Sequence, residues 1–149
     1  MSLRLFLPAD TTALALGADA VAAAIRAAAA QRALAIDLVR NGSRGVFWLE
    51  PLLEVERDGQ RIAFGPLQAA DIPGVLAALD RDASEHPLYL GPVEDIPWLA
   101  AQQRLTFARA GLSDPLSLTQ YRSLEGFAGL ERALQLTPQG LSLIHISEP

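Results

Sequence analysis

The polar turn Asn41–Gly45 is the stretch whose residue types and spacing could most readily bind a ligand. It follows a buried-looking strand and precedes the apolar, aromatic run Val46–Leu49, so we expect it at the edge of a hydrophobic core. Its glycines could let backbone N–H groups surround an anion, with Arg44 as a further contact. The alternative, which we favour, is that the glycines only permit the turn.

Two further sets of residues could bind a metal or act as a base. His86 has neither a second His nor a Cys near it in the sequence, so we favour a structural histidine in a linker. Glu50, Glu54 and Glu56 could surround a cation, but Glu54 and Glu56 alternate along a predicted strand. We therefore assign these two to the solvated face of a hairpin, and we name no catalytic, cofactor-binding or metal-binding residue.

Aromatic and basic residues offer two possible contact surfaces. Phe47 and Trp48 could anchor an interface or belong to the core, and the sequence leaves both open. Arg104, Phe107 and Arg109 could dock a following domain or a partner subunit, or could form one face of an ordinary amphipathic helix.

Composition excludes several classes of function. All basic residues are Arg, which removes Lys-dependent chemistry, and the absence of Cys removes disulfides, thiol nucleophiles and thiolate-bound iron. A net charge of −5 argues against nucleic acid and anionic membranes as partners. We find neither a transmembrane run nor a signal-peptide core, so we expect a cytoplasmic protein.

The first 80 residues show the periodicities of alternating strands and helices. Leu3–Leu7 alternates like a strand, the Ala-rich stretch 20–32 has a helical stripe, and Ala35–Val39 resembles a second strand. Asp10 and Asp19 are both possible N-caps. A strand, helix and strand of these lengths favour a parallel pair with a crossover.

Asp58-Gly59 predicts a two-residue hairpin turn. This turn places Val55 opposite Ile62, Leu53 opposite Phe64, and Glu56 opposite Arg61, with the apolar pairs on one face. Asp71 can then cap a helix with a buried stripe from Ile72 to Leu79. Strand, helix, strand, hairpin and helix is the order of a thioredoxin-like domain.

The sequence predicts four segments. Residues 1–80 form the thioredoxin-like domain, and 81–101 form a Pro-rich linker. Residues 102–140 contain helices, at Gln102–Ala110 and between Leu118 and Leu136, that begin a further, truncated domain. Residues 141–149 resemble the translation of a sequencing-transposon end, and we expect them to be an artefact.

The element order and several motifs resemble the thioredoxin-like ferredoxin domain of NADH-oxidising enzyme modules. In that family two pairs of cysteines hold a two-iron, two-sulfur cluster. The Gly17-Ala18 pair fits the family pattern and puts Pro8 and Ala13 at the first pair of cysteine positions, while Asn41 and Gly45 fit the second. The resemblance implies an α/β (α+β), thioredoxin-like ferredoxin-type domain that lacks its cluster cysteines.

Beyond this domain the chain is similar to the beta subunit of soluble NAD-dependent formate dehydrogenase. The stretch Tyr121–Leu134 resembles the start of the flavin-bearing domain, and Asn41–Glu56 and His86–Gly111 resemble the formate dehydrogenase branch. The resemblance implies a diaphorase subunit, with FMN, NAD and a four-iron cluster in the full-length protein and no cofactor in this fragment.

The implied partners are a molybdenum-bearing alpha subunit and a cluster-bearing gamma subunit. We expect the full-length protein to be an oxidoreductase that passes electrons from formate through iron–sulfur clusters and FMN to NAD, and the fragment alone to be inactive. The alternatives are a non-catalytic thioredoxin-like assembly module, and a diaphorase subunit of a NAD-reducing hydrogenase or of respiratory complex I.

Overall fold

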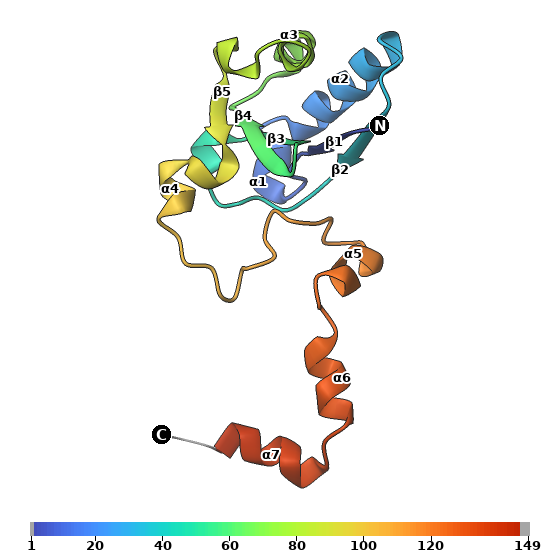
Figure 1. Cartoon of the computed structure of the whole chain (residues 1–149), viewed down its shortest axis with the longest axis vertical. Coiled ribbons are helices and arrows are strands. Elements are labelled where there is room, and N and C mark those ends of the chain that lie inside the picture. Colours follow the sequence, from blue (N-terminus) through green and yellow to red (C-terminus); the bar gives the residue numbers. More distant parts are fainter. Residues whose placement is uncertain (1, 147–149) are drawn as a thin grey trace. The chain divides into compact units, whose positions relative to one another are not determined.

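The computed structural model describes residues 2–146. The described part divides into two compact units, with the boundary between Asp114 and Pro115. The first unit contains a five-stranded mixed sheet (Figure 1). Its strands lie in the order β2-β1-β3-β4-β5. They are β1 (Leu3–Phe6), β2 (Ile36–Val39), β3 (Leu53–Arg57), β4 (Gln60–Phe64) and β5 (Tyr89–Pro92).

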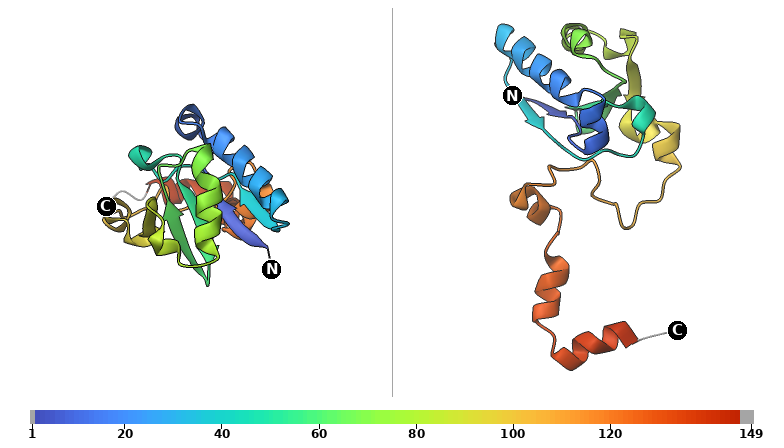
Figure 2. Two further views of the ribbon diagram at one scale, coloured as in Figure 1. Left: turned by 90° about the horizontal axis from the view of Figure 1, so that it is seen from above. Right: turned by 180° about the vertical axis from the view of Figure 1, so that it is seen from behind.

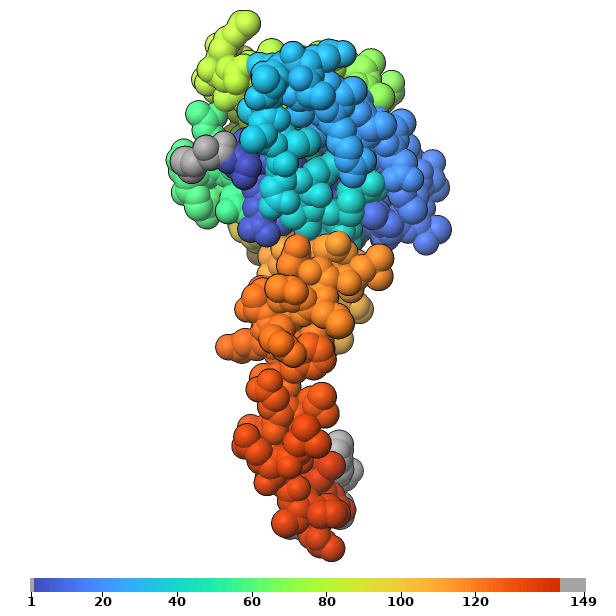
Figure 3. Space-filling view, turned by 90° about the vertical axis from the view of Figure 1, so that its right-hand side faces the viewer, coloured from blue at the N-terminus to red at the C-terminus, as the bar shows by residue number. Residues whose placement is uncertain are grey.

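The parallel pair predicted from the sequence is confirmed. β1 and β2 run parallel, and α1 (Thr11–Ala15) and α2 (Ala18–Gln31) connect them. Asp10 caps α1, because its carboxylate accepts hydrogen bonds from the backbone N–H groups of Thr12 and Ala13 at 3.1 and 3.3 Å. Asp19 is not a cap but lies in the first turn of α2. The edge strand β2 reaches the surface beside α2 (Figure 3).

The hairpin forms in the predicted register. Leu53 pairs with Phe64, Val55 with Ile62 and Glu56 with Arg61. Asp58 and Gly59 both have positive φ, at 52° and 79°, as a tight hairpin turn of this kind requires.

The two faces of the sheet are covered differently. α2 and α3 (Ile72–Leu79) contact each other and cover one face (Figure 2), where the larger apolar core lies. The opposite face packs against η1 (Phe47–Leu49), η4 (Val93–Asp95) and α4 (Pro97–Ala100). Its smaller core is a cluster of apolar residues from several elements: Val46, Leu52, Ala63, Val93, Ile96 and Leu99.

The interval 81–101 is not the expected linker. After η2 (Ala69–Asp71), α3 and η3 (Ala83–Glu85), β5 adds a fifth strand antiparallel to β4, with Ile62 opposite Pro92. The prolines had suggested a break, but β5 is an edge strand, where a residue without an N–H is tolerated. The sheet therefore extends beyond the boundary predicted at residue 80.

The helix predicted at Gln102–Ala110 is also absent from the structure. Segment 102–112 consists of turns closed by short-range hydrogen bonds, such as Phe107 O to Ala110 N at 3.0 Å. Gly111 has a φ of +80°. This segment belongs to the first unit and returns to the sheet.

The second unit is helical, as expected between Leu118 and Leu136. It contains α5 (Leu118–Ser123), α6 (Ala128–Leu134) and α7 (Pro138–Ile146). Pro138 is the first residue of α7, a position where proline is tolerated because its N–H would have no partner within the helix. Of the expected artefact 141–149, residues 147–149 lie outside the described part, and the origin of this segment stays a prediction. Among residues 2–146, the helices are too short or too polar to cross a membrane.

In the first unit, a parallel strand pair is followed by an antiparallel hairpin that lies on the β1 side, and α2 and α3 share one face. This is the thioredoxin-like topology. The fold class predicted from the sequence is confirmed.

Candidate functional site

The candidate site begins where β1 and β2 end side by side. The loops that leave these strands are joined directly, because Ala9 donates its backbone N–H to the carbonyl of Asn41 at 2.9 Å. The Ser43 N–H donates to Asp10 Oδ2 at 3.0 Å. Arg40 adds bonds to the carbonyls of Leu7 and Pro8, both at 3.2 Å. Hydrogen bonds between protein groups therefore join the two loops.

The four positions that the resemblance assigns to lost cysteines lie in or next to these loops. Pro8, Ala13 and Asn41 are buried, whereas Gly45 is exposed with a φ of +85°. Pro, Ala and Gly have no side-chain atom that binds iron, and Asn41 Nδ2 donates to the carbonyl of Gly111 at 2.8 Å. These residues do not fit an iron–sulfur cluster. Within residues 2–146 no cluster of His, Cys, Asp and Glu has the arrangement of a metal site.

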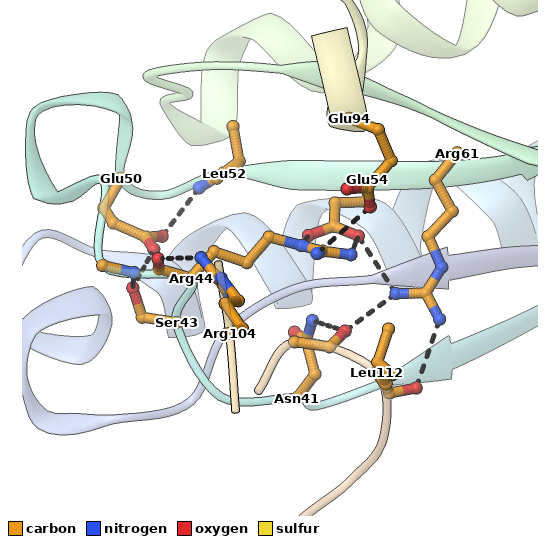
Figure 4. A network of polar contacts seen from close by, with 12 residues as sticks. Asn41, Ser43, Arg44, Glu50, Leu52, Glu54, Arg61, Glu94, Arg104 and Leu112 are labelled. Carbon is orange, nitrogen blue, oxygen red and sulfur yellow. Dashed lines mark hydrogen bonds and ion pairs between the residues drawn. The ribbon is translucent and has the colours of Figure 1, made fainter. Parts of the chain in front are cut away.

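A buried ion pair lies next to the loops, on the sheet face that is opposite α2 and α3 (Figure 4). Arg44 Nε and Nη2 donate to the two carboxylate oxygens of Glu54 at 2.5 and 3.0 Å, a bidentate geometry. The side chains are 6% and 1% exposed. Arg44 Nη1 also donates to Glu94 at 3.4 Å.

This pair argues against one alternative that the sequence left open and corrects one interpretation. Arg44 is not a free anion clamp, because its donors are used by Glu54 and Glu94. Glu54 does not lie on a solvated face, although Glu56 is exposed as predicted. The hairpin pattern correctly placed Glu54 on the same sheet face as Glu56. It did not show that residues distant in the sequence cover this face at Glu54.

Arg61 connects the ion pair to segment 102–112. Its Nη1 donates to Glu54 Oε2 at 3.0 Å and to the Gly111 carbonyl at 2.7 Å, and Nη2 reaches the Leu112 carbonyl at 3.2 Å. Its guanidinium also lies 3.4 Å from the ring centroid of Phe6. We call Arg44, Glu54 and Arg61 the buried ionic network.

From the sequence, the only partner predicted for Arg61 was Glu56, opposite it in the hairpin. A signal for the larger role was present, because the confirmed register also places Arg61 diagonally across from Glu54 on the same face. For the bond between Asn41 and Gly111, 70 residues apart, we find no local signal.

The carboxylates of Glu54 and Glu94 stabilise the positive charge of Arg44. Burial acts to lower the pKa of Arg44, but the hydrogen bond and charge of Glu54, and the charge of Glu94, outweigh it and raise that pKa above its ordinary value. Arg44 therefore stays a cation while buried. Such a network can hold loops and strands in register.

Glu50 is a second buried carboxyl, separate from the network. It accepts hydrogen bonds from Ser43 Oγ at 2.8 Å and from the Leu52 N–H at 2.9 Å. Burial raises its pKa, the two hydrogen bonds oppose that rise, and the nearby charges of Asp10 and Glu54 add to it. Glu50, Glu54 and Glu56 thus have different partners and do not form a cation site.

The aromatic residues of the turn are exposed rather than core. Phe47 and Trp48 are 53% and 58% exposed, and the Trp48 ring lies edge-on to that of Trp98, with centroids 5.6 Å apart. Beside them is a hollow of about 770 Å³, which Phe47, Arg104 and Phe107 help to line. Of the two roles left open for Phe47 and Trp48, the core role is excluded.

His86 has a local structural role. Its Nδ1 accepts the Leu88 N–H at 3.2 Å, and its ring packs edge-on against Phe64 at 5.8 Å. These contacts are those of a histidine that fixes the approach to β5, in line with the structural interpretation.

Among known proteins, the chain has similarity to solved structures only at low identity. No protein-family model and no curated protein matches the chain. It is similar to two structures of a thioredoxin-like 2Fe-2S ferredoxin from Aquifex aeolicus, each with 13% identity and a TM-score of 0.48. The matches cover 60% and 62% of this chain, and 97% and 93% of those chains. On the strand order and pairing of its sheet, the chain is a mixed α/β protein with a thioredoxin-like first unit.

Proposed function

We propose that this chain is the N-terminal part of the diaphorase subunit of a soluble NAD-dependent formate dehydrogenase, in which its first unit docks other subunits and does not carry electrons. The observation that supports a docking role is the junction of the β1 and β2 loops. Hydrogen bonds between Ala9 and Asn41 and between Asp10 and Ser43 join the two loops to which the sequence resemblance assigns the lost cysteine positions.

The assignment to formate dehydrogenase rests on the sequence motifs. Asn41–Glu56 and His86–Gly111 contain much of what builds the site, including Arg44, Glu54 and Gly111. In such an assembly the molybdenum, iron–sulfur, FMN and NAD chemistry belongs to other subunits and to the rest of this one. The residues of this chain provide a rigid scaffold and an exposed aromatic surface.

Two measurements test this function. The codons that follow Gly140 in the uninterrupted gene should encode the glycine-rich, Arg-Gly-Gly loop of the flavin domain within roughly thirty positions. A gene without that loop would refute the diaphorase assignment. The genes beside it should encode a molybdenum subunit; a nickel–iron subunit would indicate a hydrogenase instead.

The docking role has a direct test. The full chain, immobilised by an affinity tag, should retain the molybdenum-bearing and cluster-bearing subunits encoded beside it. Protein purified from iron-replete cells should lack iron–sulfur absorption, because Pro8, Ala13, Asn41 and Gly45 supply no thiolate. Iron–sulfur absorption would contradict the proposal that the unit does not carry electrons. Failure to retain either subunit would contradict the docking role.

A further inference from the structure

A solvent-exposed hollow lies beside the turn, and Arg44 of the buried ionic network is one of the residues that line it. It is lined by residues 43–45 and Phe47 from the turn and by residues 102–107 and Ala110 from the later segment, and its volume is about 770 Å³. The large apolar side chains that line it are Phe47, Leu105 and Phe107. Leu105 and Phe107 are 90% and 73% exposed, although large apolar residues are usually buried.

Apolar surface continues beyond the hollow. Trp48 follows Phe47 in the chain and packs against Trp98, and both tryptophans are more than half exposed. Neighbouring exposed aromatic residues commonly mark protein interfaces, where Trp contributes much of the binding energy. This combined surface is wider than the lining of the hollow itself, which favours a protein segment over a small molecule.

The charge of the hollow limits what can occupy it. Arg44 is neutralised by Glu54, and the side chains that line the hollow among residues 2–146 include no carboxylate. Arg104 donates Nε to Gln102 Oε1 at 2.9 Å and Nη2 to the Arg44 carbonyl at 2.7 Å, both uncharged acceptors. None of the ion pairs within the described residues includes Arg104. Arg104 therefore has no ion-pair partner on the side of the apolar surface, although Glu94 lines a neighbouring hollow together with it.

We propose that this hollow receives an apolar segment with an adjacent carboxylate, presented by a neighbouring subunit of the assembly. Apolar side chains of that segment pack between Phe47 and Phe107, and its carboxylate pairs with Arg104. A second copy of this chain fits less well, because two chains of net charge −5 repel each other. The inference rests on the proposed docking function and assigns its surface and partner chemistry.

The test measures binding of the full chain to the purified molybdenum-bearing and cluster-bearing subunits by biolayer interferometry. The double substitution Leu105→Asp/Phe107→Asp should weaken binding about tenfold or more, because it puts charge at the apolar centre. Arg104→Gln should weaken binding less and flatten its dependence on salt between about 50 and 300 mM. Leu16→Asp, at an exposed apolar residue outside the hollow, is the matched control and should bind like wild type.

The outcomes separate this inference from the proposed function. If the wild-type chain binds and the double variant binds equally well, the hollow is not the docking site, although docking stands. If the wild-type chain binds neither subunit, the docking function fails and the inference fails with it. If sedimentation shows a dimer of the chain alone that the double variant abolishes, the occupant is a second copy and the assignment to another subunit is wrong. Circular dichroism checks that each variant is folded.

Discussion

Replacing Glu54 by Gln should destabilise the first unit more than any other single change in the buried ionic network. The carboxylate accepts three hydrogen bonds, two from Arg44 and one from Arg61. Its loss leaves Arg44, with a side chain only 6% exposed, without its main counter-charge. Breaking a buried ion pair in this way costs about 3–5 kcal/mol.

The rank of the single variants follows from the same geometry. Arg44→Met leaves Glu54 still paired with Arg61, so it should cost less than Glu54→Gln. The double variant Arg44→Met/Glu54→Leu buries apolar groups in place of the pair. It should be destabilised by less than the sum of the corresponding single variants, Arg44→Met and Glu54→Leu, because neither charge is left alone.

Urea unfolding of the full chain measures these differences. Both tryptophans, Trp48 and Trp98, lie in the first unit, so their fluorescence reports on that unit. Glu56→Gln is the control, since Glu56 is on the same strand, is 40% exposed and is 3.9 Å from Arg4. It should change stability by about 0.5 kcal/mol or less. A Glu54→Gln variant within about 1 kcal/mol of wild type would refute the assigned role of the network.

Three further substitutions test the loops around the network. Burial raises the pKa of Glu50 above its ordinary value of 4.5, so the folded state is stabilised by holding this proton and loses that stability when Glu50 ionises. Glu50→Gln cannot ionise, so its free energy of unfolding should rise relative to that of wild type as the pH increases from 4.5. Parallel pH profiles of the two proteins in urea unfolding would contradict this. Asp10→Ala removes the α1 cap and the bond to the Ser43 N–H, and urea unfolding should show a loss of about 1–2 kcal/mol; an unchanged midpoint would argue against the cap. Gly111→Ala should lower the free energy of unfolding by about 1–3 kcal/mol, because the φ of Gly111 is +80° and a Cβ would lie 2.8 Å from Arg44 Cγ. Gly42→Ala is the control and should match wild type in the same assay, since Gly42 has open space around it and no positive φ.

The sequence predicted the features that depend on nearby residues. The hairpin register follows from Asp58-Gly59 and the alternation on both sides of it, and the helix at 20–32 follows from composition and periodicity. These signals lie within one element or two adjacent ones. For that reason the fold class could be predicted without knowledge of any long-range contact.

The features that the sequence did not predict depend on segments far apart in the chain. Arg44 and Arg61 lie only 10 and 7 residues from Glu54, but Arg61 is bonded to the carbonyl of Gly111, 50 residues later, and Arg44 also bonds to Glu94. The alternation of Glu54 and Glu56 predicts that they share a face, but it cannot tell which of the two is covered. β5 was missed because the spacing of Pro87, Pro92 and Pro97 excludes a continuous helix and was interpreted as a linker, whereas an edge strand tolerates proline.

These long-range contacts also determine where the first unit ends. A chain that stopped at residue 80 would lose β5, the apolar residues from Val93 to Leu99, and the carbonyls of Gly111 and Leu112. Arg61 would then lack its main-chain acceptors, and part of the smaller core would be exposed to water. Both losses destabilise the same sheet face. The thioredoxin-like unit that can act as a scaffold therefore includes residues up to Asp114, and the surface proposed for docking is built on the part that a boundary at residue 80 would remove.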